Sequence, residues 1–214
     1  MTVGVVGAGR MGRALAEAAG RAGRPAVLVP ARGDPRRIAR LLEQCAVVVL
    51  AVPLPAVWEF LRGPAGLDGR GRTLIDPTNP AGDACLPAGR SAGELVAEAA
   101  ADHWRVAKAF NTVPAQAVAR CRLDGRPVSL PVATDHPAAL RDTFALARTL
   151  GFEPLDAGDI RAARHLEALA ALLMAVSDRH RLHGDISIRI GVPGPNGRAP
   201  DDLDPLRAAV CQAC

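Results

Sequence analysis

The strongest constraint on the fold is a glycine-rich turn that follows a short β-branched run near the start of the chain. The run Thr2–Val6 predicts a strand, and the turn Gly7-Ala8-Gly9-Arg10-Met11-Gly12 comes directly after it. The alanine-rich stretch that leads to Gly23 predicts a helix. Strand, turn and helix in this order form the context in which the spacing Gly-x-Gly-x-x-Gly binds the pyrophosphate of a dinucleotide.

The three glycines of this turn have separate physical roles. Gly7 allows the tight turn, Gly9 lets the backbone approach a pyrophosphate, and Gly12 lets the helix pack closely on the strand. The free N–H groups at the positive end of the helix then hold the anion. The alternative is a glycine-rich turn that only connects two elements. We expect all six residues, Gly7 to Gly12, to contribute to a cofactor site.

The residues after the second predicted strand, Ala26–Val29, indicate which dinucleotide binds. Sites for NAD usually place an acidic residue there for the ribose hydroxyls, but this chain has no acid before Asp34. Arg32 and Arg36 are suited instead to a bidentate contact with a 2′-phosphate. The sequence therefore predicts NADP(H) rather than NAD. The alternative is that the arginines belong to a solvated helix start.

Predicted strands and helices alternate through most of the chain, which indicates an α/β fold with a Rossmann-like, doubly wound parallel sheet over residues 1–157. Apolar residues then recur at helical spacing from Ile160 to about His183, so residues 158–191 are predicted to form a helical segment for substrate or dimer contacts. The Pro-, Gly- and Asp-rich residues 192–214 predict an extended or disordered tail. Further strands are expected at residues 46–52, 73–75, 105–110, 128–133 and 152–156, and helices at 35–44, 55–61, 92–101 and 137–150.

Polar and proline residues cluster where three predicted strands end. Because ligands of open α/β sheets bind outside the carboxyl ends of the strands, we expect cofactor contacts from Val52, Pro53, Asn79 and Pro80. The Pro and Asn residues also suit an ordinary turn.

Candidate catalytic residues follow on later elements. Lys108 and Asn111 end a third strand, and His165 on the C-terminal helix is a candidate proton donor. Lys108 could instead form a salt bridge to Glu94 or a neighbour, and His165 could be a surface residue.

Composition excludes several other classes. The charge balance is 26 basic against 22 acidic residues, and only 3% of residues are aromatic, so no basic stripe for nucleic acid is evident. The longest apolar run, residues 45–58, is too short for a bilayer and contains prolines. With no signal peptide and an odd number of cysteines, we expect a cytoplasmic protein with reduced thiols. Cys211 and Cys214 have the spacing of a redox pair, but catalytic pairs of this spacing normally open a helix, so we expect a frayed tail instead. His180, His183 and Asp185 lack a fourth ligand, so no metal site is expected.

The chain resembles the NADPH-dependent reductases of the deazaflavin coenzyme F420, which are related to the cytosolic domains of STEAP metalloreductases. The resemblance extends to about Gly191. It implies NADP at the edge of the first strand, a second cofactor or substrate stacked on the nicotinamide, and a homodimer. The segments that carry it are Ile75–Pro80, Ser91–Leu95, Lys108–Thr112, Asp156–Gly158 and Arg161–Glu167.

Three functions remain open from the sequence. The first is hydride transfer between NADPH and a deazaflavin resembling coenzyme F420. The second is reduction of a small imine, enone or ketone, favoured by a glycine turn closer to those of imine reductases and by the isoleucine-rich segment Asp185–Ile190. Such a substrate requires a proton donor, for which His165, Lys108 or, through a water, Asn111 is available. The third is a non-catalytic NADP-binding module.

Overall fold

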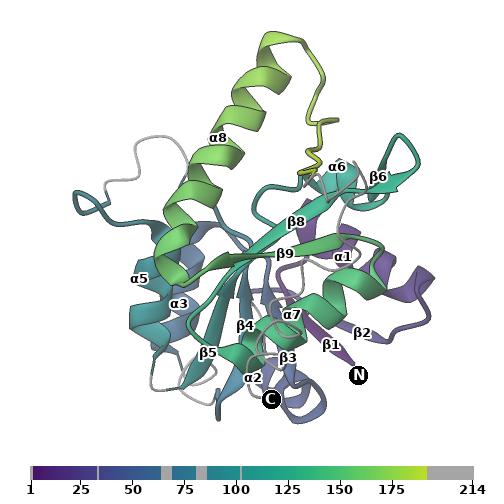
Figure 1. The fold of residues 1–214 in the computed structure, drawn as a ribbon. Coiled ribbons are helices and arrows are strands. Elements are labelled where there is room, and N and C mark those ends of the chain that lie inside the picture. Colours follow the sequence, from purple (N-terminus) through teal and green to yellow (C-terminus); the bar gives the residue numbers. More distant parts are fainter. Residues whose placement is uncertain (1, 33, 64–68, 81–85, 102, 192–214) are drawn as a thin grey trace, which may run out of the picture.

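The computed structural model describes residues 2–32, 34–63, 69–80, 86–101 and 103–191. Its main feature is a seven-stranded sheet with the order β2-β1-β3-β4-β5-β8-β9 (Figure 1). A small hairpin of β6 (Arg122–Leu123) and β7 (Arg126–Pro127) lies outside that sheet. The strands of the main sheet are β1 (Val3–Val6), β2 (Ala26–Val29), β3 (Val47–Leu50), β4 (Arg72–Asp76), β5 (Trp104–Lys108), β8 (Ser129–Ala133) and β9 (Glu153–Gly158).

Helices cover both faces of the sheet, as a doubly wound fold requires. The helix predicted at residues 35–44 is present with those bounds, because Asp34 caps its first turn and Pro35 occupies its first position. The helices are α1 (Arg10–Arg21), α2 (Pro35–Gln44), α3 (Leu54–Arg62), α5 (Ala92–Ala100), α6 (Ala115–Val118), α7 (Pro137–Thr149), the 3₁₀ turn η1 (Ile160–Ala162) and α8 (Ala163–Arg179).

The predicted Rossmann-like sheet is confirmed, with one difference in strand direction. Strands β1 to β5 are parallel, but β8 pairs with β5 antiparallel at Lys108 and Ala133, and β9 is parallel to β8. Parallel neighbours require a long crossover, usually a helix across one face of the sheet. The connection from β5 to β8 instead contains the four-residue α6 and the hairpin β6–β7. The sheet is therefore mostly, not wholly, parallel.

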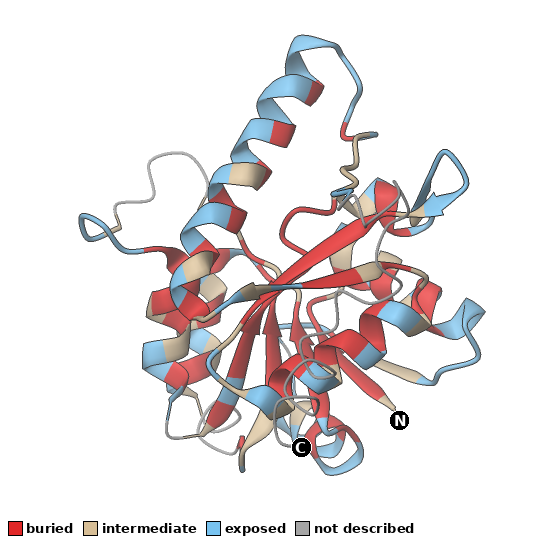
Figure 2. Ribbon diagram, in the orientation of Figure 1, coloured by how far each residue is buried: buried red, intermediate tan, exposed pale blue. Residues whose placement is uncertain are grey.

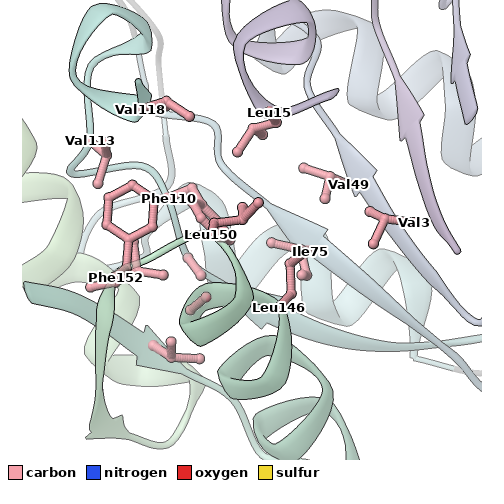
Figure 3. Close-up of a cluster of buried hydrophobic side chains, with 14 of the residues drawn as sticks. Val3, Leu15, Val49, Ile75, Phe110, Val113, Val118, Leu146, Leu150 and Phe152 are labelled. Atoms are coloured by element: carbon pink, nitrogen blue, oxygen red, sulfur yellow. The ribbon is translucent and has the colours of Figure 1, made fainter. Parts of the chain in front are cut away.

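The core has two layers, one on each face of the sheet. Successive strand residues point to opposite faces, so Val5 packs beneath α1, α6 and α7, whereas Val6 packs toward α2, α3 and α5. Figure 3 shows the first layer, in which Phe110 and Phe152 lie together. The inner strands β1, β3, β4, β5 and β8 are almost entirely buried (Figure 2), which explains their near-continuous apolar sequences, whereas the edge strands β2 and β9 are partly exposed.

Helix α8 follows the last strand and projects from the body of the molecule (Figure 1). The sequence predicted that this helix runs to about residue 183, but it ends at Arg179. Arg181 adopts a left-handed backbone with φ 54°, and the amides of Arg181 and Leu182 donate to the carbonyls of Asp178 and Ser177. This Schellman pattern closes the helix without a glycine. None of the helices in the described ranges has the length and hydrophobicity of a membrane span.

The predicted tail, residues 192–214, and its cysteines Cys211 and Cys214 lie outside the described residues.

Candidate cofactor and substrate site

The glycine turn has the backbone geometry that a dinucleotide-binding turn needs. Gly7 has φ +114°, and a Cβ there would lie 2.2 Å from the Ala51 carbonyl oxygen. A Cβ on Gly12 would lie 1.8 Å from the Gly7 carbonyl oxygen, so the start of α1 packs directly on the turn. Gly9 is the N-cap of α1, and a Cβ there would meet nothing within 4 Å. The turn is therefore closed on its protein side and open at Gly9, where a phosphate would approach.

The other residues of the turn surround this opening. Arg10 is exposed at the first position of α1, and Met11 packs partly against the core. The Ala8 carbonyl accepts a 2.8 Å hydrogen bond from Nε of Arg13.

A cleft of about 890 Å³ opens between the ends of β2 and β3 and the helices α2 and α3. Its volume is that of a typical cofactor site. Arg32 and Arg36, predicted after one strand, and Val52 and Pro53, predicted after another, all line it. Glu59 on α3 lines it as well, with its carboxylate 3.6 Å from the Arg32 guanidinium.

Asp34, the first acid after β2, has a structural partner. Its carboxylate accepts a 2.9 Å hydrogen bond from the backbone N–H of Arg36 and caps α2. An acid that bound ribose hydroxyls would turn its oxygens into the cleft, whereas the Asp34 side chain caps the N-terminus of α2. The charged groups left at the end of β2 are Arg32, which is 87% exposed, and Arg36. The cleft is therefore better suited to a 2′-phosphate than to a free hydroxyl.

A pair of asparagines joins the ends of β4 and β5. Nδ2 of Asn79 donates to the Asn111 carbonyl oxygen at 2.8 Å, and Nδ2 of Asn111 donates to Oδ1 of Asn79 at 2.9 Å. Pro80 follows and is partly buried. Asn111, predicted as a catalytic residue, therefore contacts Asn79, predicted as a cofactor residue. Both lie at the carboxyl edge, where Asp76 and Lys108 are paired in register.

Three buried oxygens around this pair lack hydrogen-bond partners within the described part of the chain. They are Oδ1 of Asn111 and the hydroxyls of Thr78 and Thr112. Nearly all buried polar groups in proteins are paired, so three orphans at one sheet edge indicate a place where a ligand supplies the partners. An amide N–H, as in a carboxamide, fits Oδ1 of Asn111.

Phe110, which the sequence did not single out, shapes the loop that carries Asn111. It is fully buried yet has φ 63°, a left-handed conformation that costs a bulky residue about 1–3 kcal/mol. Its ring packs edge-on against Phe152, with centroids 5.9 Å apart. Packing thus stabilises a strained turn directly after β5. Such strain is concentrated at functional sites.

Lys108 is fully buried, and all three of its N–H donors have acceptors. Nζ lies 2.9 Å from Oδ2 of Asp76, 2.5 Å from the Thr78 carbonyl oxygen and 3.0 Å from Oε1 of Glu167. The alternative interpretation, that Lys108 forms a salt bridge, is therefore confirmed, but its partners are Asp76 and Glu167 rather than Glu94.

Glu94 belongs to a neighbouring cluster at the start of α5. It receives hydrogen bonds from Ser91, and the Arg164 guanidinium lies 2.9 Å from it. Burial alone raises the pKa of the Glu94 carboxyl, but the hydrogen bonds from Ser91 and Arg164 outweigh it and hold this pKa below its ordinary value.

The fold does not place His165 close to the other candidate catalytic residues, Lys108 and Asn111. It is exposed and lines a shallow hollow of about 360 Å³ together with Arg161 and Arg164. Residues two apart lie on nearly opposite faces of a helix, and Glu167 is the one that points toward Lys108. The other C-terminal histidines are part of no metal cluster: among the described residues, no three metal-ligating side chains gather.

Comparison with known proteins assigns the family. Residues 2–80, which contain the glycine turn, the arginine-lined cleft and Asn79, match the family model described as NADP oxidoreductase, coenzyme F420-dependent. These residues, 79 of the 214 in the chain, therefore belong to this family. Metalloreductase STEAP3 of Rattus norvegicus is 31% identical over 183 residues, which make up 80% of this chain and 37% of the rat protein. The chain thus spans well under half of that relative.

Solved structures share the fold. A hypothetical protein from Sinorhizobium meliloti is 29% identical with a TM-score of 0.64, covering 76% of this chain and 87% of its own. A protein from Arthrobacter sp. FB24, described as an F420-dependent NADP-reductase, has a TM-score of 0.70 at 21% identity, with 84% and 94% covered. An imine reductase from Myxococcus stipitatus in complex with NADP⁺ has a TM-score of 0.60 at 18% identity, with 85% and 64% covered.

Proposed function

We propose that the protein transfers a hydride between NADPH and a deazaflavin acceptor resembling coenzyme F420. The observation that carries the cofactor part is the cleft beside the glycine turn, in which Arg32 and Arg36 face the solvent while Asp34 is engaged as a helix cap. The family to which residues 2–80 belong, named for NADP and coenzyme F420, supports the acceptor.

Different parts of the cofactor would bind to residues from different halves of the sheet. The N–H groups at Gly9 and the start of α1 hold the pyrophosphate, and Arg32 and Arg36 bind the 2′-phosphate. The unpaired Oδ1 of Asn111 accepts from the nicotinamide carboxamide. NADPH supplies the hydride when it is bound. The chain's own contribution is to hold the reacting carbons about 3–3.5 Å apart and to exclude water.

The placement of the titratable groups favours a deazaflavin over an imine or a ketone. A carbonyl or imine acceptor requires a proton donor within hydrogen-bond reach. Lys108 has its three donors engaged by Asp76, Thr78 and Glu167, and His165 lies on the outer face of α8. A deazaflavin ring accepts the hydride with little acid–base assistance. Reduction of a small imine remains the second candidate, favoured by the imine reductases that share the fold.

Absorbance-monitored turnover tests this proposal. NADPH is mixed with oxidised coenzyme F420 and the protein, beside a reaction without acceptor. We expect the deazaflavin band to bleach in proportion to NADPH oxidation. Tight NADPH binding without bleaching would contradict the deazaflavin acceptor and turn the search to small imines and ketones. Bound NADPH that no acceptor oxidises would support a non-catalytic module.

We further propose that α8 pairs with a second copy of the chain. The helix buries Leu166, Ala170 and Leu173, yet Leu172 is 60% and Met174 43% exposed. A helix that is apolar on several sides is normally buried on several sides. Figure 2 shows the exposed turns of α8 where the helix leaves the body.

A further inference from the structure

The Lys108 cluster contains more buried charge than a fold needs for stability. Asp76 and Glu167 are 1% and 8% exposed, and Lys108 is fully buried. Removing three charges from water carries a large desolvation cost, which pairing and hydrogen bonds repay only in part, and an apolar replacement is often no less stable. A cluster of this kind is therefore better explained by what it positions.

On one side, the cluster fixes the loop after β4. Nζ of Lys108 donates to the Thr78 carbonyl oxygen at 2.5 Å, and the Thr78 N–H donates to Oδ1 of Asp76 at 2.9 Å. Both backbone polar groups of Thr78 are therefore held by the cluster. The next residue is Asn79, whose side chain bonds to Asn111. Lys108 thus holds the backbone of Thr78, the residue directly before Asn79, and through it positions the asparagine pair.

On the other side, the cluster docks α8 on α5. Glu167 of α8 accepts hydrogen bonds from the N–H groups of Ala92 and Gly93 at 3.1 and 2.9 Å, in the first turn of α5. The positive end of α5 stabilises this carboxylate. A Cβ on Gly93 would lie 2.7 Å from Cβ of Ala163 and 3.2 Å from Cδ of Lys108, so glycine is required for the approach. Helix α8, α5 and Lys108 therefore meet in direct contact.

We propose that Lys108 and Glu167 are positioning residues, which hold Asn79 and Asn111 in place for the nicotinamide half of NADP(H) when α8 is docked on α5. This inference rests on the proposed function. It assigns Lys108 a role other than proton donor, and it gives α8 a role in cofactor binding although α8 contributes nothing to the arginine-lined cleft.

The variant Glu167→Gln tests this coupling. It keeps an oxygen for the α5 amides but removes the charge that faces Lys108. Dissociation constants are measured for NADPH and for 2′-phospho-AMP, which occupies only the adenosine half. We expect NADPH to bind about tenfold more weakly or worse, because the ion pair between Glu167 and Lys108 is lost, while the fragment binds as in the wild type. Glu98→Gln on the exposed side of α5 is the matched control, and it should change neither constant.

Two results would overturn the inference. Equal weakening of NADPH and the fragment would mean that Glu167 only supports the fold, and unchanged binding of both would mean that it positions nothing. Failure of the wild type to bind either ligand would instead contradict the proposed function.

A measurement on the wild type keeps the inference testable if the variant does not fold. The Thr78 amide should exchange slowly with solvent deuterium in the absence of cofactor, because its N–H donates to Asp76 while Lys108 holds the carbonyl of the same residue. Rapid exchange that slows only when NADPH is added would show that the cofactor, and not the cluster, orders this loop.

Discussion

At the scale of single residues, the side chains at the end of β2 decide which cofactor fits. The sequence placed Arg32 and Arg36 near a 2′-phosphate but left Asp34 as a competing ribose ligand. In the structure Asp34 caps α2, which favours the prediction of a 2′-phosphate site. A carboxylate that accepts the N–H of its own helix has little freedom to serve a ligand.

The variant Arg32→Ala should weaken NADPH far more than NADH. Removing one guanidinium from a 2′-phosphate costs a charge-assisted hydrogen bond, about 1.5–3 kcal/mol, which corresponds to roughly tenfold to a hundredfold in the dissociation constant. Fluorescence titration with both nucleotides measures this ratio. Arg37→Ala is the matched control, because Arg37 is exposed on α2 but does not line the cleft. Equal losses for NADPH and NADH would contradict the 2′-phosphate role.

The ion cluster shows where residue-level prediction stops. Lys108 was singled out because it ends a strand, but neither carboxylate partner was anticipated. Glu167 meets the α5 amides across 74 positions of sequence, and no periodicity encodes a contact of that range. The left-handed turn at Phe110 was missed for a related reason, since tertiary packing against Phe152 imposes it on a residue that disfavours it.

At the scale of elements, the turn between β1 and α1 is the part that the sequence predicted most completely. Its glycine spacing predicts that the helix packs closely on the turn and that the N-terminal end of the helix is open. The structure has both features, at Gly12 and at Gly9. The direction of β8 was not predictable from alternation alone, because a hairpin and a short helix replace the usual crossover before it. The end of α8 was missed because an arginine, not a glycine, adopts the terminating conformation.

Two glycine-to-alanine variants on α1 should have opposite effects. Gly12→Ala places a methyl group 1.8 Å from the Gly7 carbonyl oxygen, so the turn must shift and both the melting temperature and NADPH affinity should fall. Gly20→Ala on the same helix meets nothing within 4 Å and should raise the free energy of unfolding by about 0.5–1 kcal/mol. Calorimetry measures both. A Gly12→Ala protein as stable as the Gly20→Ala protein would contradict the close packing of the turn.

At the scale of the whole molecule, the arginine-lined cleft lies between the ends of β2 and β3 and the helices α2 and α3, whereas α8 packs on α5 and projects from the body of the molecule (Figure 1). From the change of periodicity after Gly158, the sequence predicted a helical segment, and α8 lies there. It could not show that Glu167 ties the two parts together.

The dimer proposal predicts a particle of two chains. Light scattering should give twice the chain mass of 22.2 kDa for the wild type, and Leu172→Asp should give a monomer, because a charge would be buried in the contact. Leu123→Asp is the control, since Leu123 is 39% exposed on the β6–β7 hairpin, away from α8. A monomeric wild type, or a Leu172→Asp dimer, would exclude pairing through this face.

The central claim is direct hydride transfer from NADPH to a deazaflavin, and isotope transfer tests it most directly. NADPH carrying deuterium at the transferred position of C4 is mixed with oxidised coenzyme F420 and the protein in ordinary water, and the reduced deazaflavin is weighed by mass spectrometry. Because the two carbons react in contact, with water excluded, we predict a product heavier by one deuterium. A reduced product without deuterium would contradict direct transfer, and no reduced product at all would contradict the acceptor.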